Sequence, residues 1–145
     1  MALYSVSAPS TATVTVAPIA TLWAGAGKRL RLKELGVFCN AATASAVALY
    51  RATNTPAAST TAVGQGYDTT DLAATGLLGT VWSTAPTVSA LLGLRRVQLP
   101  AAIGAGVIWQ FDDLVVGPAG TSSLVLWNHG GTTNSVLQIY AVWDE

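Results

Sequence analysis

Short runs of alternating apolar and polar residues, interrupted by glycine, proline and asparagine, cover most of the chain. Alternation with a period of two is typical of a β-strand that buries one face. It is clearest in residues 30–32, 47–52, 107–112 and 137–143. Because no long amphipathic helical pattern accompanies these runs, the sequence predicts an all-β fold.

The alternation slips by one residue near Glu34. Leu30 and Leu32 share one face of the first run, whereas the next apolar residues, Leu35 and Val37, have the opposite parity. An extra residue inserted in one strand, a β-bulge, returns both sets to the same face. We therefore predict a bulge near Glu34.

Residues 11–16 also alternate, and we expect further strands there and over residues 122–127. Residues 77–82 and 91–99 are plausible strands with weaker periodicity. Residues 87–94 are open to a second interpretation, one or two helical turns that begin near Pro86. Residues 54–66 are rich in threonine, alanine, proline and glycine, which predicts a loop. Residues 1–20 form either an extended N-terminal arm or the first strand.

About eight strands, with turn residues every 10 to 15 positions or so, predict an antiparallel sandwich or barrel of jelly-roll type. The chain has 145 residues, a length that suits one domain over residues 1–145.

The composition narrows the function classes. Only 10% of the residues are charged and the formal net charge is zero, which disfavours nucleic acid as a partner. The weakly polar stretches are shorter than the ~20 residues of a membrane span, and the N-terminus lacks the pattern of a signal peptide. A surface so poor in charge is unfavourable for a free monomer, so we expect other subunits to cover much of it.

Residues suited to catalysis or metal binding are few and scattered. His129 is the only histidine and lies in an Asn-His-Gly-Gly turn, with no Gly-x-Ser-x-Gly elbow in the sequence. Cys39 is the only cysteine and has no disulfide partner. Residues 112–113 and 144–145 are adjacent acidic pairs, which alone do not form the carboxylate pair of a glycosidase. Residues 68–71 contain only part of a calcium loop, and residues 25–29 only part of a phosphate loop. We predict no catalytic residues, no metal and no cofactor.

Four of the seven basic residues fall within six positions, at Lys28, Arg29, Arg31 and Lys33. The last three share one strand face, about 6.6 Å apart. Two interpretations stay open: a basic stripe that docks on an acidic partner, or the solvated outer face of a strand.

The five tryptophans divide into two groups. Trp109 and Trp143 lie on the apolar faces of their strands and are assigned to the core. Trp23, Trp82 and Trp127 are candidates for exposure, and tryptophan is a favoured anchor at protein interfaces. Exposed tryptophans also stack on sugars.

The segments WAGAGKRLRL (23–32), ALYR (48–51), VIWQF (107–111) and IYAVWDE (139–145) resemble those of small structural proteins of tailed-phage virions. These are proteins of the capsid decoration (cement) or minor structural type. The resemblance extends over most of the chain. It rests on these several segments together, because none of them is a signature motif. It implies a jelly-roll domain, often trimeric, on the outer capsid lattice.

From these arguments we expect a non-enzymatic virion protein, made in the host cytoplasm, that stabilises the capsid surface. Its partners would be the major capsid protein and further copies of itself in a homo-oligomer, expected to be a trimer. A tail or baseplate component and a carbohydrate-binding jelly-roll module are the alternatives. The expected interface residues are Trp23, Lys28, Arg29, Arg31, Lys33, Trp82 and Trp127.

Overall fold

The structure, a computed structural model, describes the backbone of residues 1–145 and every side chain except that of Leu92. In this described chain the only regular elements are eleven strands, and none of the structure is a helix that is long and apolar enough to cross a membrane. The strands are β1 (Leu3–Pro9), β2 (Ala17–Trp23), β3 (Leu30–Cys39), β4 (Ser45–Ala52), β5 (Ala57–Val63), β6 (Gln65–Gly66), β7 (Leu77–Thr84), β8 (Val88–Leu99), β9 (Gly106–Val116), β10 (Leu124–Asn128) and β11 (Leu137–Asp144).

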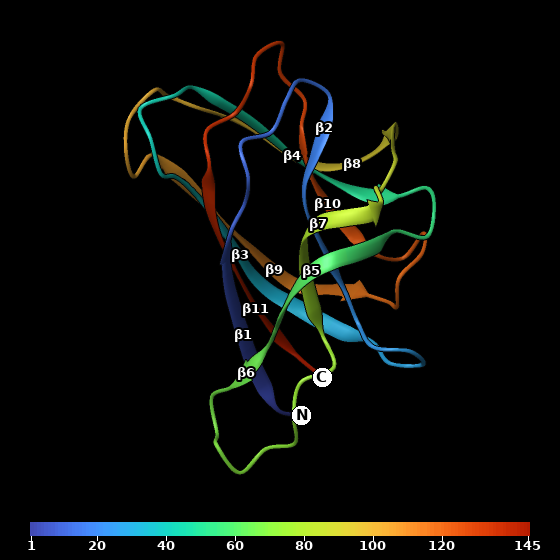
Figure 1. Cartoon of the computed structure of the whole chain (residues 1–145). Coiled ribbons are helices and arrows are strands. Elements are labelled where there is room, and N and C mark those ends of the chain that lie inside the picture. The colour runs from blue at the N-terminus through green and yellow to red at the C-terminus, as the bar shows by residue number, and fades with distance from the viewer.

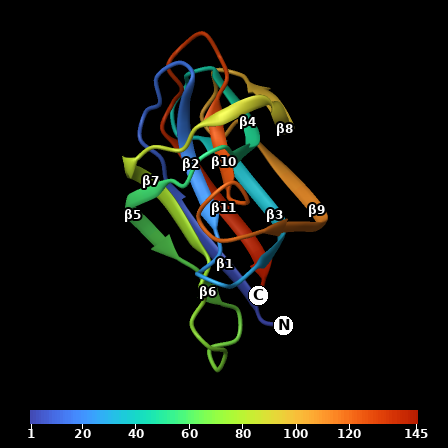
Figure 2. The ribbon, with the colours of Figure 1, turned by 90° about the vertical axis from the view of Figure 1, so that its right-hand side faces the viewer.

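The strands form two antiparallel sheets that pack against each other (Figures 1 and 2). The five-stranded sheet has the order β6-β1-β11-β3-β9, and the six-stranded sheet has the order β5-β7-β2-β10-β4-β8. This arrangement confirms the predicted all-β sandwich. When β5, β6 and β7 are set aside, the other eight strands pair as β1-β11-β3-β9 and β2-β10-β4-β8.

Apolar side chains at alternate positions of each strand fill the space between the sheets. The five-stranded sheet contributes Val37, Ile139 and Trp143, and the six-stranded sheet contributes Leu49 and Leu124. Trp143 is fully buried and Trp109 is also buried. Their predicted place in the core is confirmed.

The predicted bulge is present in β3. In the pairing with β11, Val142 lies opposite Glu34 and Trp143 lies opposite Leu32, so Lys33 is the extra residue. The pairing of β3 with β9 shifts at the same place. The insertion lets Leu32 and Leu35 both face the core, as the change of parity in the sequence requires.

Two segments differ from the prediction. Residues 11–16 do not form a strand, because only Thr13 makes an isolated bridge and Val16 has a φ of 52°. The strands lie on either side of this loop, and β1 pairs along its whole length with β11. The N-terminal segment is therefore the first strand of the sandwich and not a free arm.

Residues 54–66, predicted to be a loop, contain β5 and β6. β5 is an edge strand whose side chains are mostly exposed, so its sequence carries no apolar alternation. The helical interpretation of residues 87–94 is wrong, since β8 begins at Val88 and pairs with β4.

Candidate functional site

Two of the predicted basic residues are paired within the chain. Arg31 Nη1 lies 3.4 Å from Asp113 Oδ1 on β9, and Lys33 Nζ lies 3.2 Å from Asp144 Oδ2 on β11. These strands flank β3 on either side, so their carboxylates neutralise the positive charges of Arg31 and Lys33 on β3. The side chains of Arg31 and Lys33 are 50% and 39% exposed, and exposed ion pairs contribute only about 0–1 kcal/mol each, so a partner can still contact both cations. Arg29 precedes β3 and is exposed.

The expectation that Trp23 is exposed is wrong, since its side chain is only 8% exposed. The ring lies over Gly79 of the adjacent strand β7 and beside Ala58, and a Cβ on Gly79 would come within 2.7 Å of it. Two small residues on neighbouring strands make the pocket that buries the indole, and this pairing is invisible in the local sequence.

Trp82 and Trp127 are partly exposed. Trp82 Nε1 donates a hydrogen bond to Thr21 Oγ1 at 3.0 Å, which fixes its ring against β2. Trp127 pairs with Ala48 of β4. The structure therefore places the predicted tryptophans on the six-stranded sheet, whereas Arg31 and Lys33 lie on the five-stranded sheet, so the predicted interface residues do not form one surface.

The six-stranded sheet has a second layer of aromatic side chains on the face away from the core. Val125 is fully buried yet stands outside the core cluster, with Tyr50 and Thr21 as its cross-strand neighbours. Arg96 of β8 covers Tyr50, with its guanidinium carbon 5.7 Å from the ring centroid, and its Nη2 donates to the phenol oxygen at 2.6 Å. This outer layer makes the face partly apolar.

The outer face of the five-stranded sheet is also aromatic. The rings of Phe38 and Tyr140 stack with their centroids 6.3 Å apart. Tyr140 donates a hydrogen bond of 2.5 Å to Glu34 Oε1, and this bond, together with partial desolvation, raises the pKa of Tyr140 to about 12. Ile108, on the neighbouring strand, is 51% exposed. An exposed apolar residue beside a stacked aromatic pair suits a contact with another protein surface.

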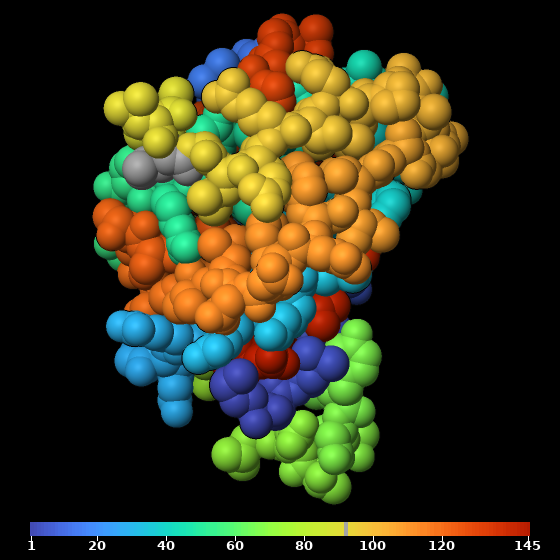
Figure 3. Space-filling model, turned by 180° about the vertical axis from the view of Figure 1, so that it is seen from behind, coloured from blue at the N-terminus to red at the C-terminus, as the bar shows by residue number. Residues whose placement is uncertain are grey.

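The two long edge strands β8 and β9 lie on the same side of the sandwich and contact each other. Figure 3 shows their yellow to orange side chains over much of the molecule seen from behind. β8 carries the basic pair Arg95 and Arg96, and β9 carries the acidic pair Asp112 and Asp113. The guanidinium carbon of Arg95 also lies 5.6 Å from the ring centroid of Phe111. Charges of opposite sign therefore stand on two adjacent strand edges.

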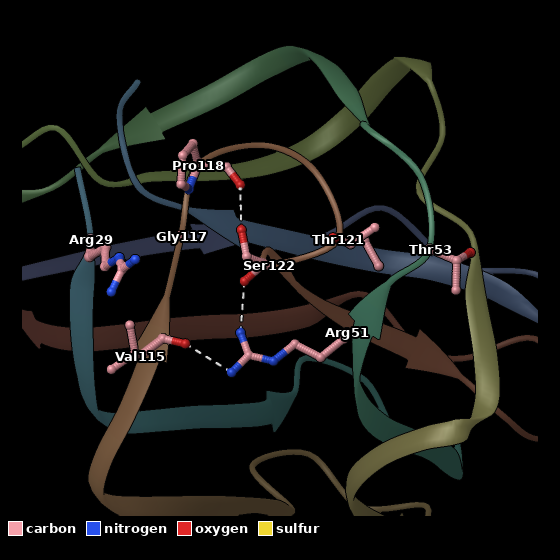
Figure 4. Close-up of a pocket in the computed structure, with 9 residues that line it drawn as sticks. Arg29, Arg51, Thr53, Val115, Gly117, Pro118, Thr121 and Ser122 are labelled. Carbon is pink, nitrogen blue, oxygen red and sulfur yellow. Dashed lines mark hydrogen bonds between the residues drawn. The ribbon is translucent and has the colours of Figure 1, made fainter. Parts of the chain in front are cut away.

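A cavity of about 630 Å³ opens where β4, the end of β9 and the turns around them meet. Figure 4 shows Arg29 at one end, Thr53 at the other, and Arg51 and Ser122 between them. Arg51 donates from Nη1 to Ser122 O at 2.7 Å and from Nη2 to Val115 O at 2.8 Å. Burial lowers the pKa of its guanidinium.

The acidic motifs noted in the sequence act locally. Asp68 accepts hydrogen bonds from the backbone N–H and the hydroxyl of Thr70, which lower the pKa of its carboxyl and close its own turn. Among the side chains that the structure describes, no three histidine, cysteine, aspartate or glutamate residues gather as metal ligands would. His129 Nε2 lies 3.4 Å from Val97 O.

Four side chains with structural roles here, Arg51, Arg95, Arg96 and Tyr140, are not among the residues predicted from the sequence. One pattern marks Arg51, because it has the same parity as Val47 and Leu49 and so a charge falls on an apolar strand face. The importance of the other three depends on partners from distant strands, which no local pattern reveals.

Compared with known proteins, the chain matches no protein-family model and no curated protein.

Proposed function

We propose that this chain is a non-enzymatic structural subunit of a tailed-phage virion, of the capsid decoration type, that binds the capsid lattice as a homo-oligomer. The observation that carries the proposal is the pair of long edge strands, β8 and β9, which stand side by side with charges of opposite sign. The sequence resemblance and the charge-poor surface point in the same direction.

The strand order supports the jelly-roll part of the proposal. The eight strands pair as β1-β11-β3-β9 and β2-β10-β4-β8, so the first and last strands are neighbours. Successive strands of this set alternate between the sheets, except that β4 and β8 pair within one sheet. Two interleaved Greek keys produce this pattern. Strands β5 to β7 extend it at the edges next to β1 and β2.

The edge strands support self-association. An edge strand presents unpaired N–H and C=O groups, to which a strand of another chain adds. Around a three-fold axis, β8 of one copy would meet β9 of the next, and Arg95 would then approach Asp112 of the neighbour. Such a head-to-tail contact closes into a ring of three when successive copies are rotated by 120°, and a trimer is the proposed form.

The outer face of the five-stranded sheet is the proposed contact with the major capsid protein. It combines the Phe38–Tyr140 stack with the exposed Ile108. Burial of apolar area there would contribute roughly 25 cal/mol per Å² before the cost of association. The Arg31–Asp113 and Lys33–Asp144 pairs at the same face supply polar contacts around it.

The test has two parts. Sedimentation of the purified chain at micromolar concentration should show a trimer, and a monomer under these conditions would contradict the oligomeric part. Phage heads and tails, purified separately, are then incubated with the labelled chain and imaged. Density on the head lattice supports the proposal, density on tails replaces it with a tail component, and absence from both contradicts a virion role.

A second candidate is binding of carbohydrate. The observation that favours it is the partial exposure of Trp82 and Trp127 on the face that also carries Tyr50. Aromatic faces stack on sugar rings, and a fixed ring binds at low entropic cost. A glycan array probed with the wild-type chain and with Trp127→Ala tests it, since binding that the substitution leaves intact, or no binding, removes this candidate.

A further inference from the structure

The cavity at the end of the sandwich contains a cation that is held in place. Arg51 lies opposite Leu124 in the pairing of β4 with β10 and shares its parity with the core residues Val47 and Leu49. Its side chain therefore points between the two sheets. There its two terminal nitrogens donate to the carbonyl oxygens of Val115 and Ser122, so the guanidinium has a fixed position on the cavity wall (Figure 4).

The positive charge in this cavity has no acidic partner. The lining consists of two arginines, Arg29 and Arg51, with small, apolar and hydroxyl residues and no carboxylate. Within the described side chains, neither arginine takes part in an ion pair. Carbonyl dipoles only partly offset the cost of removing a cation from water, and the lowered pKa of Arg51 reflects the same imbalance.

The remaining lining groups suit a bound anion. Thr53, Thr121 and Ser122 bring hydroxyl groups to the wall, and a hydroxyl can donate to an oxyanion. The volume of about 630 Å³ lies in the range of small-molecule sites, roughly 300–1,000 Å³. Arg29 is exposed and outside any ion pair in the described chain, so its planar guanidinium is free to grip a carboxylate or phosphate with two parallel hydrogen bonds.

We propose that this cavity is a binding site for a small anionic molecule, held through its carboxylate or phosphate group by Arg29 and Arg51. Arg29 is the ligand-binding cation, and Arg51 positions the wall while adding its charge. This inference goes beyond the proposed virion role, which needs no such site and rests on β8 and β9.

The experiment is an NMR titration of the isotope-labelled chain at constant ionic strength. The probes are inorganic phosphate, glucuronate as a carboxylated sugar, and glucose as its neutral counterpart. We expect saturable shifts of the backbone amides of residues 115–123 with phosphate, glucuronate or both, and none with glucose. The stronger of the two anions identifies the preferred group.

Two variants make the titration decisive. Arg29→Gln should weaken binding about ten-fold or more, the effect of losing a charge-assisted contact. Arg31→Gln is the matched control, because it removes the same charge two residues away, outside the cavity lining, and should leave the affinity unchanged. Absence of saturable shifts, or equal losses in the two variants, would overturn the proposal.

Discussion

At the scale of single residues, the most consistent feature is an aromatic ring that lies over a glycine of a neighbouring strand. It occurs on the outer faces of both sheets, where a Cβ at the glycine would occupy the space of the ring. The pairs are Gly36 with Tyr140, Gly106 with Phe38, and Gly79 with Trp23. The ring covers backbone that a glycine leaves bare, an arrangement that stabilises sheets. These glycines let an aromatic ring approach the backbone closely.

We predict that Gly36→Ala lowers the free energy of unfolding by about 1–3 kcal/mol, the usual cost of inserting a methyl group into a packed contact. Tyr140 lies directly opposite Gly36 and its ring fills that space. Denaturant unfolding measures the change. Gly131→Ala is the control, because nothing lies near a Cβ at Gly131, and it should change stability by less than about 0.5 kcal/mol.

Gly36→Ala in a Tyr140→Ala background should lower the free energy of unfolding clearly less than in the wild-type chain, since the ring that the new methyl group displaces is gone. An equal cost in both backgrounds would show that the backbone at Gly36, and not the ring, is responsible.

The hydrogen bond of Tyr140 to Glu34 predicts an alkaline effect. Because the pKa of Tyr140 is raised from 10.0 to about 12, the folded chain keeps a proton that the unfolded chain has lost in this range. The contribution to stability is complete below about pH 10 and disappears as the pH rises through 12. Unfolding of wild-type and Tyr140→Phe chains from pH 8 to 12 should show a smaller decline for the variant, and parallel declines would contradict the assignment.

At the scale of elements, the bulge in β3 adjusts the strand to β11, and the pairing with β9 shifts at the same place. Lys33 is the inserted residue, so Leu32 and Leu35 face the core on either side of it. The sequence predicts this feature because the slip in parity is a local pattern. It does not predict β5, whose exposed edge position requires no apolar residues. Nor does it predict that residues 11–16 are a loop, since threonine and valine alternate there as they do in a strand.

We predict that deletion of Lys33 is tolerated, whereas deletion of Gly36 prevents folding. Without Lys33 the parity of Leu30, Leu32 and Leu35 becomes regular and the pairing with β11 continuous, at a cost of about 0–1 kcal/mol for the lost ion pair. Without Gly36 one half of β3 turns its apolar side chains to the wrong face. Circular dichroism and thermal unfolding distinguish the two, and similar behaviour of both deletions would argue against the bulge.

At the scale of the whole molecule, the sequence predicts the residue types of the candidate surfaces but not their grouping. The basic cluster is visible in the sequence, yet its neutralisation by Asp113 and Asp144 depends on β9 and β11 lying on either side of β3. Likewise, Arg95 lies over the ring of Phe111 because β8 and β9 are edges of different sheets that contact each other on one side of the sandwich. Such proximity is a property of topology, which local patterns do not encode.

For the proposed oligomer we predict that Asp112→Lys disrupts self-association, because it places a like charge opposite Arg95 of the neighbour. Adding Arg95→Glu should restore it, since the contact then has the same pair with reversed signs. Sedimentation at several concentrations gives the dissociation constants. Asp71→Lys, which makes the same charge change in an exposed loop between β6 and β7, should have no effect. Equal dissociation of all three variants would count against the β8–β9 contact.

The single cysteine offers a direct view of how the sandwich moves. Cys39 is 2% exposed and ends β3, between β11 and β9. A thiol reagent can reach it only when the strands around it separate, so the labelling rate under native conditions reports the free energy of that opening. If β9 is covered by a neighbouring copy, the rate should fall as the protein concentration rises. Labelling of Cys39 in the native chain therefore reports both local opening of the strands and self-association, without an engineered label.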